Sequence, residues 1–112
     1  MARKPYDPNN VLNGNYNLVW EDDFDGNLLD KNKWSTEVTK MGGRNILVVE
    51  DTENTIKVKD GALILTAFKD ENGVYHVPNS VHTKTTMNYL YGYAEIKAKL
   101  PLGVGCFASY WT

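Results

Sequence analysis

The chain has 112 residues, a length that suits one domain and is too short for two. Hydrophobic residues make up 42% and charged residues 23%, which excludes a disordered tail. A net charge of −2 without a basic cluster argues against a nucleic-acid partner, and no apolar run is long enough to cross a membrane.

Cysteine and histidine are too few for two common kinds of site. The single cysteine, Cys106, excludes an internal disulfide. One cysteine and two histidines are also too few ligands for a zinc site. A proline separates His76 from His82, and the two do not show a metal-ligand spacing. Cys106 stands next to small residues in a predicted strand, so we expect it to be buried and inert.

The first part of the chain divides into a leader and a strand. Residues 1–15 are rich in proline, asparagine and glycine and predict an irregular leader, and residues 16–112 form the predicted domain. From Asn17, apolar and polar residues alternate with a period of two up to an Asp-Gly turn at Gly26. This alternation predicts a β-strand.

Two hairpins follow. Residues 54–59 alternate and run into Asp60-Gly61, and residues 62–68 continue directly as an apolar run. An Asp-Gly pair between two such runs predicts a tight hairpin turn. A second turn at Glu71-Asn72-Gly73 separates this run from residues 74–77.

The last third also alternates. In residues 93–100, Ala, Ile, Ala and Leu lie on one face while tyrosine and charged residues lie on the other. This pattern is typical of a sheet with one solvent-exposed face. Residues 106–112 predict a further strand after a Pro- and Gly-containing break. No stretch shows a helical period with caps, so we predict an all-β, sandwich-like fold. A core strand running up to Thr112 leads us to expect a missing C-terminal half or a second chain that covers the open sheet edge.

Three segments, in this order and spacing, resemble glycoside hydrolase family 16. The first is Leu18 to Gly26, followed by Leu29-Asp30 and Lys33-Trp34, and the second is Asn54 to Ala67. The third is Thr83-Lys84, then Tyr91 to Pro101 and Gly105 to Trp111. The resemblance implies a concanavalin-like jelly-roll β-sandwich of antiparallel sheets, incomplete in this chain. It also implies a hydrolase that acts on β-1,3- or mixed-linkage β-glucans by a retaining mechanism.

The family's Glu-x-Asp-x-x-Glu motif, which supplies the nucleophile and the acid/base, does not occur in residues 1–112. We therefore expect no catalytic residue in this chain. Glu21, Asp23 and Asp25 share one face of the predicted first strand, at a spacing that overlaps the separation used by inverting glycosidases. Their place before an Asp-Gly turn favours a solvated face instead.

The resemblance also implies substrate contacts. Asn45 matches a family asparagine after a glycine pair, although Ile46 and Val48 replace the polar residues that usually follow, and a local turn role is the alternative. Rings at the Phe107 and Trp111 positions stack on sugar faces in relatives, whereas packing between the sheets is the alternative here. His82 and Lys84 are predicted to share a strand face where relatives place a polar pair, and an ordinary exposed surface pair is the alternative. The predicted substrate-binding residues are Trp111, Phe107, Asn45, His82 and Lys84.

Some family members hold a structural calcium, which the resemblance assigns here to backbone oxygens of Asp23 and Gly61 plus a later carboxylate. The hydrolytic reaction itself requires no cofactor. Family resemblance implies secretion, although the N-terminus has no apolar signal segment. Two rival functions remain open. One is a non-catalytic, lectin-like β-sandwich, and the other is an interaction module that pairs through an edge strand.

Overall fold

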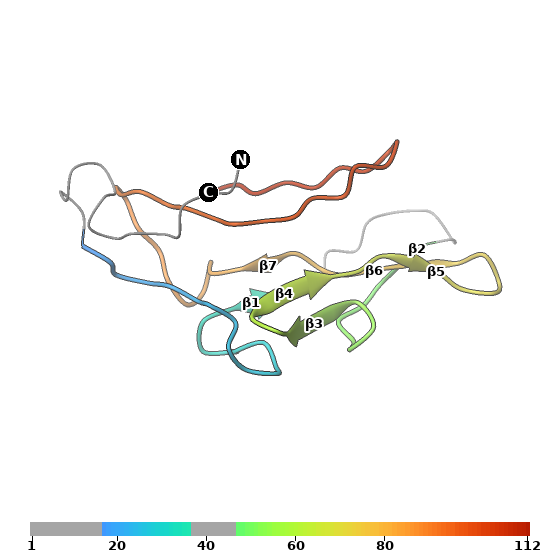
Figure 1. The fold of residues 1–112 in the computed structure, drawn as a ribbon, viewed down its shortest axis with the longest axis horizontal. Helices are drawn as coiled ribbons and strands as arrows, with labels where there is room; N and C mark the ends of the chain where they lie inside the picture. The colour runs from blue at the N-terminus through green and yellow to red at the C-terminus, as the bar shows by residue number, and fades with distance from the viewer. Residues whose placement is uncertain (1–16, 37–46) are drawn as a thin grey trace.

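The structure is a computed structural model that describes residues 17–36 and 47–112, and these contain seven short strands and no helix (Figure 1). The described residues thus include no helix with the length and apolar character needed to span a membrane. The strands are β1 (Ser35–Thr36), β2 (Leu47–Val49), β3 (Ile56–Lys59), β4 (Ala62–Leu65), β5 (Phe68–Lys69), β6 (Tyr75–Val77) and β7 (Val81–His82).

The strands pair into three small sheets. β1 pairs with β7 and β3 pairs with β4, both antiparallel, while the third sheet has the order β2-β6-β5. The predicted all-β class is confirmed for the described residues. One pairing differs from the expected antiparallel sheets, because β2 and β6 run parallel. A parallel pair needs a long crossover connection, and the chain between β2 and β6 supplies one that contains β3, β4 and β5.

Both predicted turns are present. Asp60 and Gly61 have φ values of 53° and 73°, the left-handed conformation that a two-residue turn between right-twisted strands requires. Lys59 pairs with Ala62 across this turn. In the second turn the carboxylate of Asp70 accepts hydrogen bonds from the backbone N–H groups of Asn72 and Val74, each at 2.9 Å.

The predicted first strand is not a strand in the structure, although its alternation is kept. Trp20, Asp22 and Phe24 are half-buried, and the residues between them are exposed. The Asp22 carboxylate accepts a 2.9 Å hydrogen bond from the Phe24 backbone N–H, and Phe24 has a φ of 54°. A side chain that hydrogen-bonds the backbone two residues ahead competes with the hydrogen bonds of a sheet. Residues 17–26 therefore form a curled segment around Trp34 rather than a strand.

The predicted strands at residues 93–100 and 106–112 are also absent. These residues form two extended segments that run out and back around a turn, where the Cys106 N–H donates to the Gly103 carbonyl (Figure 1). Ile96 and Leu100, on the predicted apolar face, are each about half exposed. An amphipathic strand needs a covered apolar face, and the described residues do not cover this one.

Cys106 is exposed, so the expectation of a buried thiol is wrong. The reason is local, because Cys106 closes the turn with Gly103 rather than lying within a strand.

Burial is concentrated at the β3–β4 hairpin. Val58 on β3 is the buried hydrophobic residue of the described chain, and Thr55 just before β3 is fully buried. The Thr55 hydroxyl donates to the Glu50 carbonyl at 2.6 Å and accepts from the Thr52 N–H at 3.0 Å. The Thr55 carbonyl accepts from the Thr66 N–H. Thr55 therefore joins the end of β2 to both strands of the hairpin.

Candidate functional site

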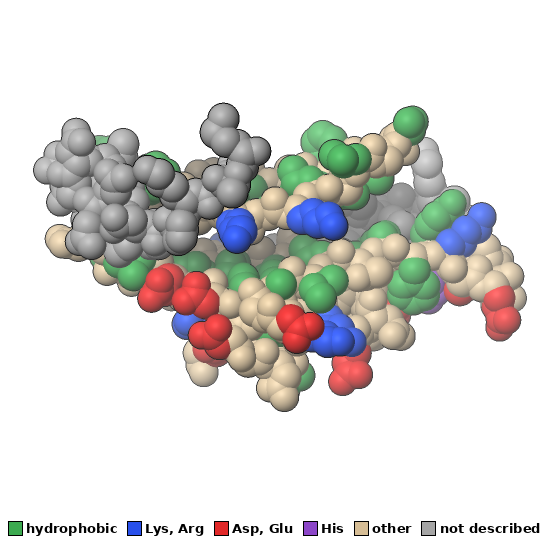
Figure 2. Space-filling view, viewed as in Figure 1, with side chains coloured by type: hydrophobic (Ala, Val, Ile, Leu, Met, Phe, Trp, Pro, Cys, Tyr) green, Lys and Arg blue, Asp and Glu red, His purple; other side chains and the backbone are tan. Residues whose placement is uncertain are grey.

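The two predicted sugar-stacking rings are open to solvent. Trp111 is 78% exposed and Phe107 is 93% exposed, both on the returning extended segment. In extended backbone, residues four apart point to the same side, so the two rings share one side of this segment. Figure 2 shows hydrophobic side chains gathered along the extended segments above the strands. In this structure neither ring packs between sheets, and an exposed aromatic face is what stacking on a pyranose requires.

The predicted polar pair lies at the end of β7. His82 pairs in register with Ser35 of β1, and its Nδ1 accepts a 3.3 Å hydrogen bond from the Lys84 backbone N–H. Lys84 is not on the strand, because β7 ends at His82 and the Thr83 carbonyl accepts from the N–H groups of Thr86 and Met87. The expectation that His82 and Lys84 share a strand face is therefore wrong. Asn45 lies outside the described residues.

The two residues assigned to calcium are neighbours in space. The backbone oxygen of Asp23 lies 3.8 Å from the position that a Cβ atom on Gly61 would occupy. The Asp23 carbonyl oxygen therefore lies next to the hairpin turn, and a backbone carbonyl is the kind of hard oxygen donor that suits calcium. Within the described residues, no group of three or more acidic, histidine or cysteine side chains is arranged to hold a metal ion. The calcium site therefore stays a prediction from the family resemblance.

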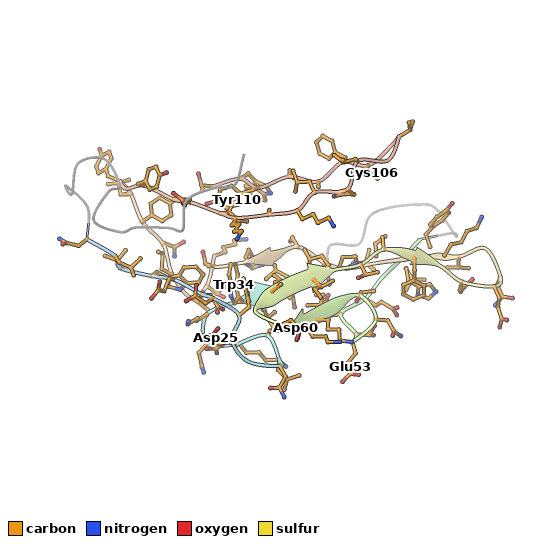
Figure 3. The ribbon with its side chains drawn as sticks, in the orientation of Figure 1. Asp25, Trp34, Glu53, Asp60, Cys106 and Tyr110 are labelled. Carbon is orange, nitrogen blue, oxygen red and sulfur yellow. The ribbon has the colours of Figure 1, made fainter. Side chains whose placement is uncertain are left out.

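The acidic residues of the curled segment line a shallow concavity together with Lys33. Glu21, Asp23 and Asp25 are exposed, as expected for a solvated face, and Figure 3 labels Asp25 on this segment. The Lys33 ammonium donates to the Glu21 carbonyl at 2.9 Å and lies 3.9 Å from the Asp22 carboxylate. Lys33 therefore stabilises the curled segment through its contacts with Glu21 and Asp22.

A further cluster, around His76, was not predicted from the sequence, where His76 showed no metal-ligand spacing to His82. The His76 Nδ1 lies 2.9 Å from the Glu50 carboxylate, and its Nε2 lies 2.9 Å from the Asp70 carboxylate. The Phe68 ring stacks on the imidazole with 4.8 Å between centroids and 4° between planes. The predicted hairpin turn could have placed Asp70 near His76, but the parallel pairing that brings Glu50 was not predictable from local pattern.

Two pKa values in this cluster are shifted. Hydrogen bonding to Asp70, supported by Glu50, raises the pKa of His76 above its ordinary value. The His76 hydrogen bond, together with the backbone N–H groups of Val74 and Asn72, lowers the pKa of Asp70. Both shifts favour the charged forms, an imidazolium and a carboxylate.

Three curated proteins resemble this chain. It is 30% identical over 113 aligned positions to "Glucan endo-1,3-beta-glucosidase A1" of Niallia circulans and 31% identical over 106 to "Glucan endo-1,3-beta-glucosidase" of Cryptopygus antarcticus. It is 32% identical over 101 positions to "Beta-glucanase" of Rhodothermus marinus. The resemblance to β-glucanases is confirmed.

The matches cover 85%, 88% and 86% of this chain but only 17%, 38% and 35% of the respective relatives. The chain therefore spans well under half the length of the β-glucanases that it matches. No protein-family model matches the chain. No solved structure gives a significant match either.

Proposed function

We propose that this chain is part of a family 16-like glycoside hydrolase that acts on β-1,3- or mixed-linkage β-glucans. The observation that carries the proposal is the similarity to three β-glucanases along nearly the whole of this chain. The all-β character of the described residues agrees with the jelly-roll sandwich that the family resemblance implies.

In this proposal the chain contributes to substrate binding rather than to bond cleavage. Retaining hydrolysis needs a nucleophilic carboxylate and an acid/base carboxyl about 5–5.5 Å apart across the glycosidic bond. The Glu-x-Asp-x-x-Glu motif that supplies them is absent from these 112 residues. We therefore assign the catalytic pair to a part of the protein outside this sequence.

The exposed rings of Phe107 and Trp111 supply the contact surface for the glucan. The C–H face of a pyranose is apolar and flat, so an aromatic ring on the same side of an extended segment gives it a matching platform. His82, at the end of β7, and Lys84, in the following turn, add polar groups in this proposal. Asn45 contributes a further amide contact.

A structural calcium is a separate part of the proposal. The backbone carbonyl groups of Asp23 and Gly61 would hold it together with a carboxylate from outside this sequence. The ion would fix the curled segment against the hairpin turn. Calcium should then raise the Tm of the intact protein, and a chelator should lower it, with magnesium as the control ion.

The decisive experiment measures both hydrolysis and binding with the intact protein. We expect release of reducing sugars from a soluble β-1,3-glucan, and NMR of the first product should show a retained anomeric configuration. Trp111→Ala should lower kcat/KM about 2- to 12-fold, the equivalent of about 0.5–1.5 kcal/mol of stacking. Tyr110→Ala is the matched control, because that ring is adjacent in sequence and points to the opposite side in extended backbone.

The outcomes separate the rival functions. Glucan binding without sugar release, still sensitive to Trp111→Ala, would favour a lectin-like module over a hydrolase. Absence of both binding and hydrolysis would contradict both carbohydrate functions and leave the edge-strand interaction module.

A further inference from the structure

The side chains around His76 come from β5, from β6 and from the residues that directly follow β2 and β5. His76 is the middle residue of β6, and it pairs in register with Val48 of β2 on one side and Phe68 of β5 on the other. Residues two apart along a strand point to the same face. Glu50, two residues after Val48, and Asp70, two residues after Phe68, therefore lie on the same face as His76.

The backbone hydrogen bonds to β6 and its flanking residues continue one residue past β2 and β5, to Glu50 and Asp70. The Glu50 N–H donates to the Val77 carbonyl at 3.0 Å, and the Asp70 N–H donates to the Val74 carbonyl at 2.8 Å. Glu50 then meets one ring nitrogen and Asp70 meets the other, both at 2.9 Å. His76 thus bridges the strands on both sides of its own.

No other charged group faces the imidazole from these strands. Phe68 of β5 covers one face of the ring. Lys69 points to the opposite side of the sheet, where its ammonium lies 5.3 Å from the centroid of Tyr75. The groups that determine the charge of His76 are therefore the carboxylates of Glu50 and Asp70.

The double bridge depends on the protonation of the ring. An imidazolium has two N–H donors, whereas a neutral imidazole has one donor and one acceptor. Ionised carboxylates only accept hydrogen bonds, so a neutral His76 can satisfy one of its two partners and must present a lone pair to the other. Asp70 is held by two backbone N–H groups in addition, so Glu50 is the partner that is released.

The backbone of Glu50 also connects β2 to the residues that lead into the β3–β4 hairpin. The backbone carbonyl of Glu50 accepts the hydroxyl proton of fully buried Thr55, the residue that leads into the β3–β4 hairpin. β2 is also an edge strand of its sheet, held along one side only by β6 in the described chain. Loss of the Glu50 contact therefore weakens the attachment of β2 and of residues 50–55.

We propose that His76, bridged by Glu50 and Asp70, is a pH-sensitive clasp that holds β2 onto β6 when protonated and releases β2 when neutral. The clasp is independent of glucan binding, because none of its residues is among those assigned to substrate. It makes the order of β2 and residues 50–55 depend on pH over a range above the ordinary histidine pKa of about 6.5.

Hydrogen exchange of the intact protein tests the clasp. At about pH 6 the peptide covering residues 47–55 should exchange several-fold more slowly in the wild type than in His76→Gln, and at about pH 9 the two should exchange alike. Comparing proteins at the same pH removes the intrinsic pH dependence of exchange. Glu50→Leu, whose side chain cannot hydrogen-bond the ring, should behave as His76→Gln does, whereas Glu53→Leu, the same change at an exposed position nearby, should behave as wild type. The β3–β4 hairpin serves as the internal reference.

Equal exchange of wild type and His76→Gln at about pH 6, or a difference that is the same at about pH 9, would overturn the proposal. A second measurement needs no variant. Nitrogen NMR of the wild type should show both His76 ring nitrogens protonated at about pH 6 and one at about pH 9, and a single protonated nitrogen at the lower pH contradicts the clasp.

Discussion

The indole Nε1 of Trp34 donates a 2.7 Å hydrogen bond to the carboxylate of Asp22, and this bond ties the curled segment to the residues that lead into β1. The Trp34 ring also meets Trp20 edge-on, with 5.0 Å between centroids, and stacks with Phe24 at 5.8 Å. One carboxylate thus positions the centre of an aromatic cluster, because its other oxygen accepts from the Phe24 N–H.

Asp22→Ala should destabilise the protein by about 1–3 kcal/mol, because the Trp34 and Phe24 N–H groups both lose their acceptor in a half-buried setting. Urea unfolding of the intact protein measures this as a lower midpoint with an unchanged m value. Asp25→Ala, an exposed carboxylate on the same segment, should stay within about 0.5 kcal/mol of wild type. Equal effects of the two variants would contradict the assigned role of Asp22.

Thr55→Val should cost about 1–3 kcal/mol, since valine keeps the shape but leaves the Glu50 carbonyl and the Thr52 N–H without their partner in a half-buried setting. The midpoint of chemical unfolding reports the loss. Thr66→Val is the control, because the Thr66 side chain is exposed and its link to Thr55 runs through the backbone. If both variants unfold at the wild-type midpoint, the hydrogen bonds of the Thr55 hydroxyl do not stabilise the protein.

Gly61→Ala should cost about 1–2 kcal/mol, the strain of placing a Cβ atom on a left-handed residue. The space itself is free, because the nearest atom to such a Cβ, the Asp23 oxygen, is at an ordinary contact distance of 3.8 Å. Gly26→Ala meets similar space without the left-handed φ and should leave the Tm close to wild type. A Gly26→Ala variant as damaged as Gly61→Ala would argue against the backbone explanation.

Asp70→Asn should lower the Tm most between about pH 4.5 and about pH 6.5. The lowered pKa of Asp70 means that its stabilising effect is present above its unfolded-state pKa and is lost as pH falls through the folded-state value. The raised pKa of His76 means that its contribution is complete below its unfolded-state pKa and is lost as pH rises through the folded-state value.

The Tm difference between wild type and Asp70→Asn should therefore shrink on both sides of this window. Thermal unfolding across a pH series gives the profile, with Glu71→Gln as a neighbouring control that removes an exposed carboxylate. A flat profile for Asp70→Asn would show that His76 and Asp70 do not titrate as a linked pair.

Local chemistry was the most predictable part of the molecule. Asp60-Gly61 and Glu71-Asn72-Gly73 define turns through the conformations that Asp, Asn and Gly adopt, and both turns are present. The alternation of Trp20, Asp22 and Phe24 also predicts which side chains are sheltered. These features depend on residues close together in sequence, where a pattern of period two or a turn residue is informative.

Features that depend on distant partners were predicted less well. The alternation in residues 93–100 describes a strand only if neighbours cover Ile96 and Leu100, and the described residues do not. Glu50 reaches His76 only through the parallel pairing of β2 and β6, for which neither segment has a local pattern. One local feature was also missed, because Cys106 was expected in a strand and instead closes a turn with Gly103.

The parallel pairing of β2 with β6 also has a consequence for the order in which the chain folds. The β3–β4 hairpin closes a two-residue loop, and such hairpins form within about 1–10 μs. β2 can pair with β6 only after the whole intervening chain has been brought back on itself, at a larger loop-closure entropy. The hairpin should therefore be protected first in a refolding experiment. The parallel pair of β2 and β6 should follow, after the β3–β4 hairpin in the chain between them has formed.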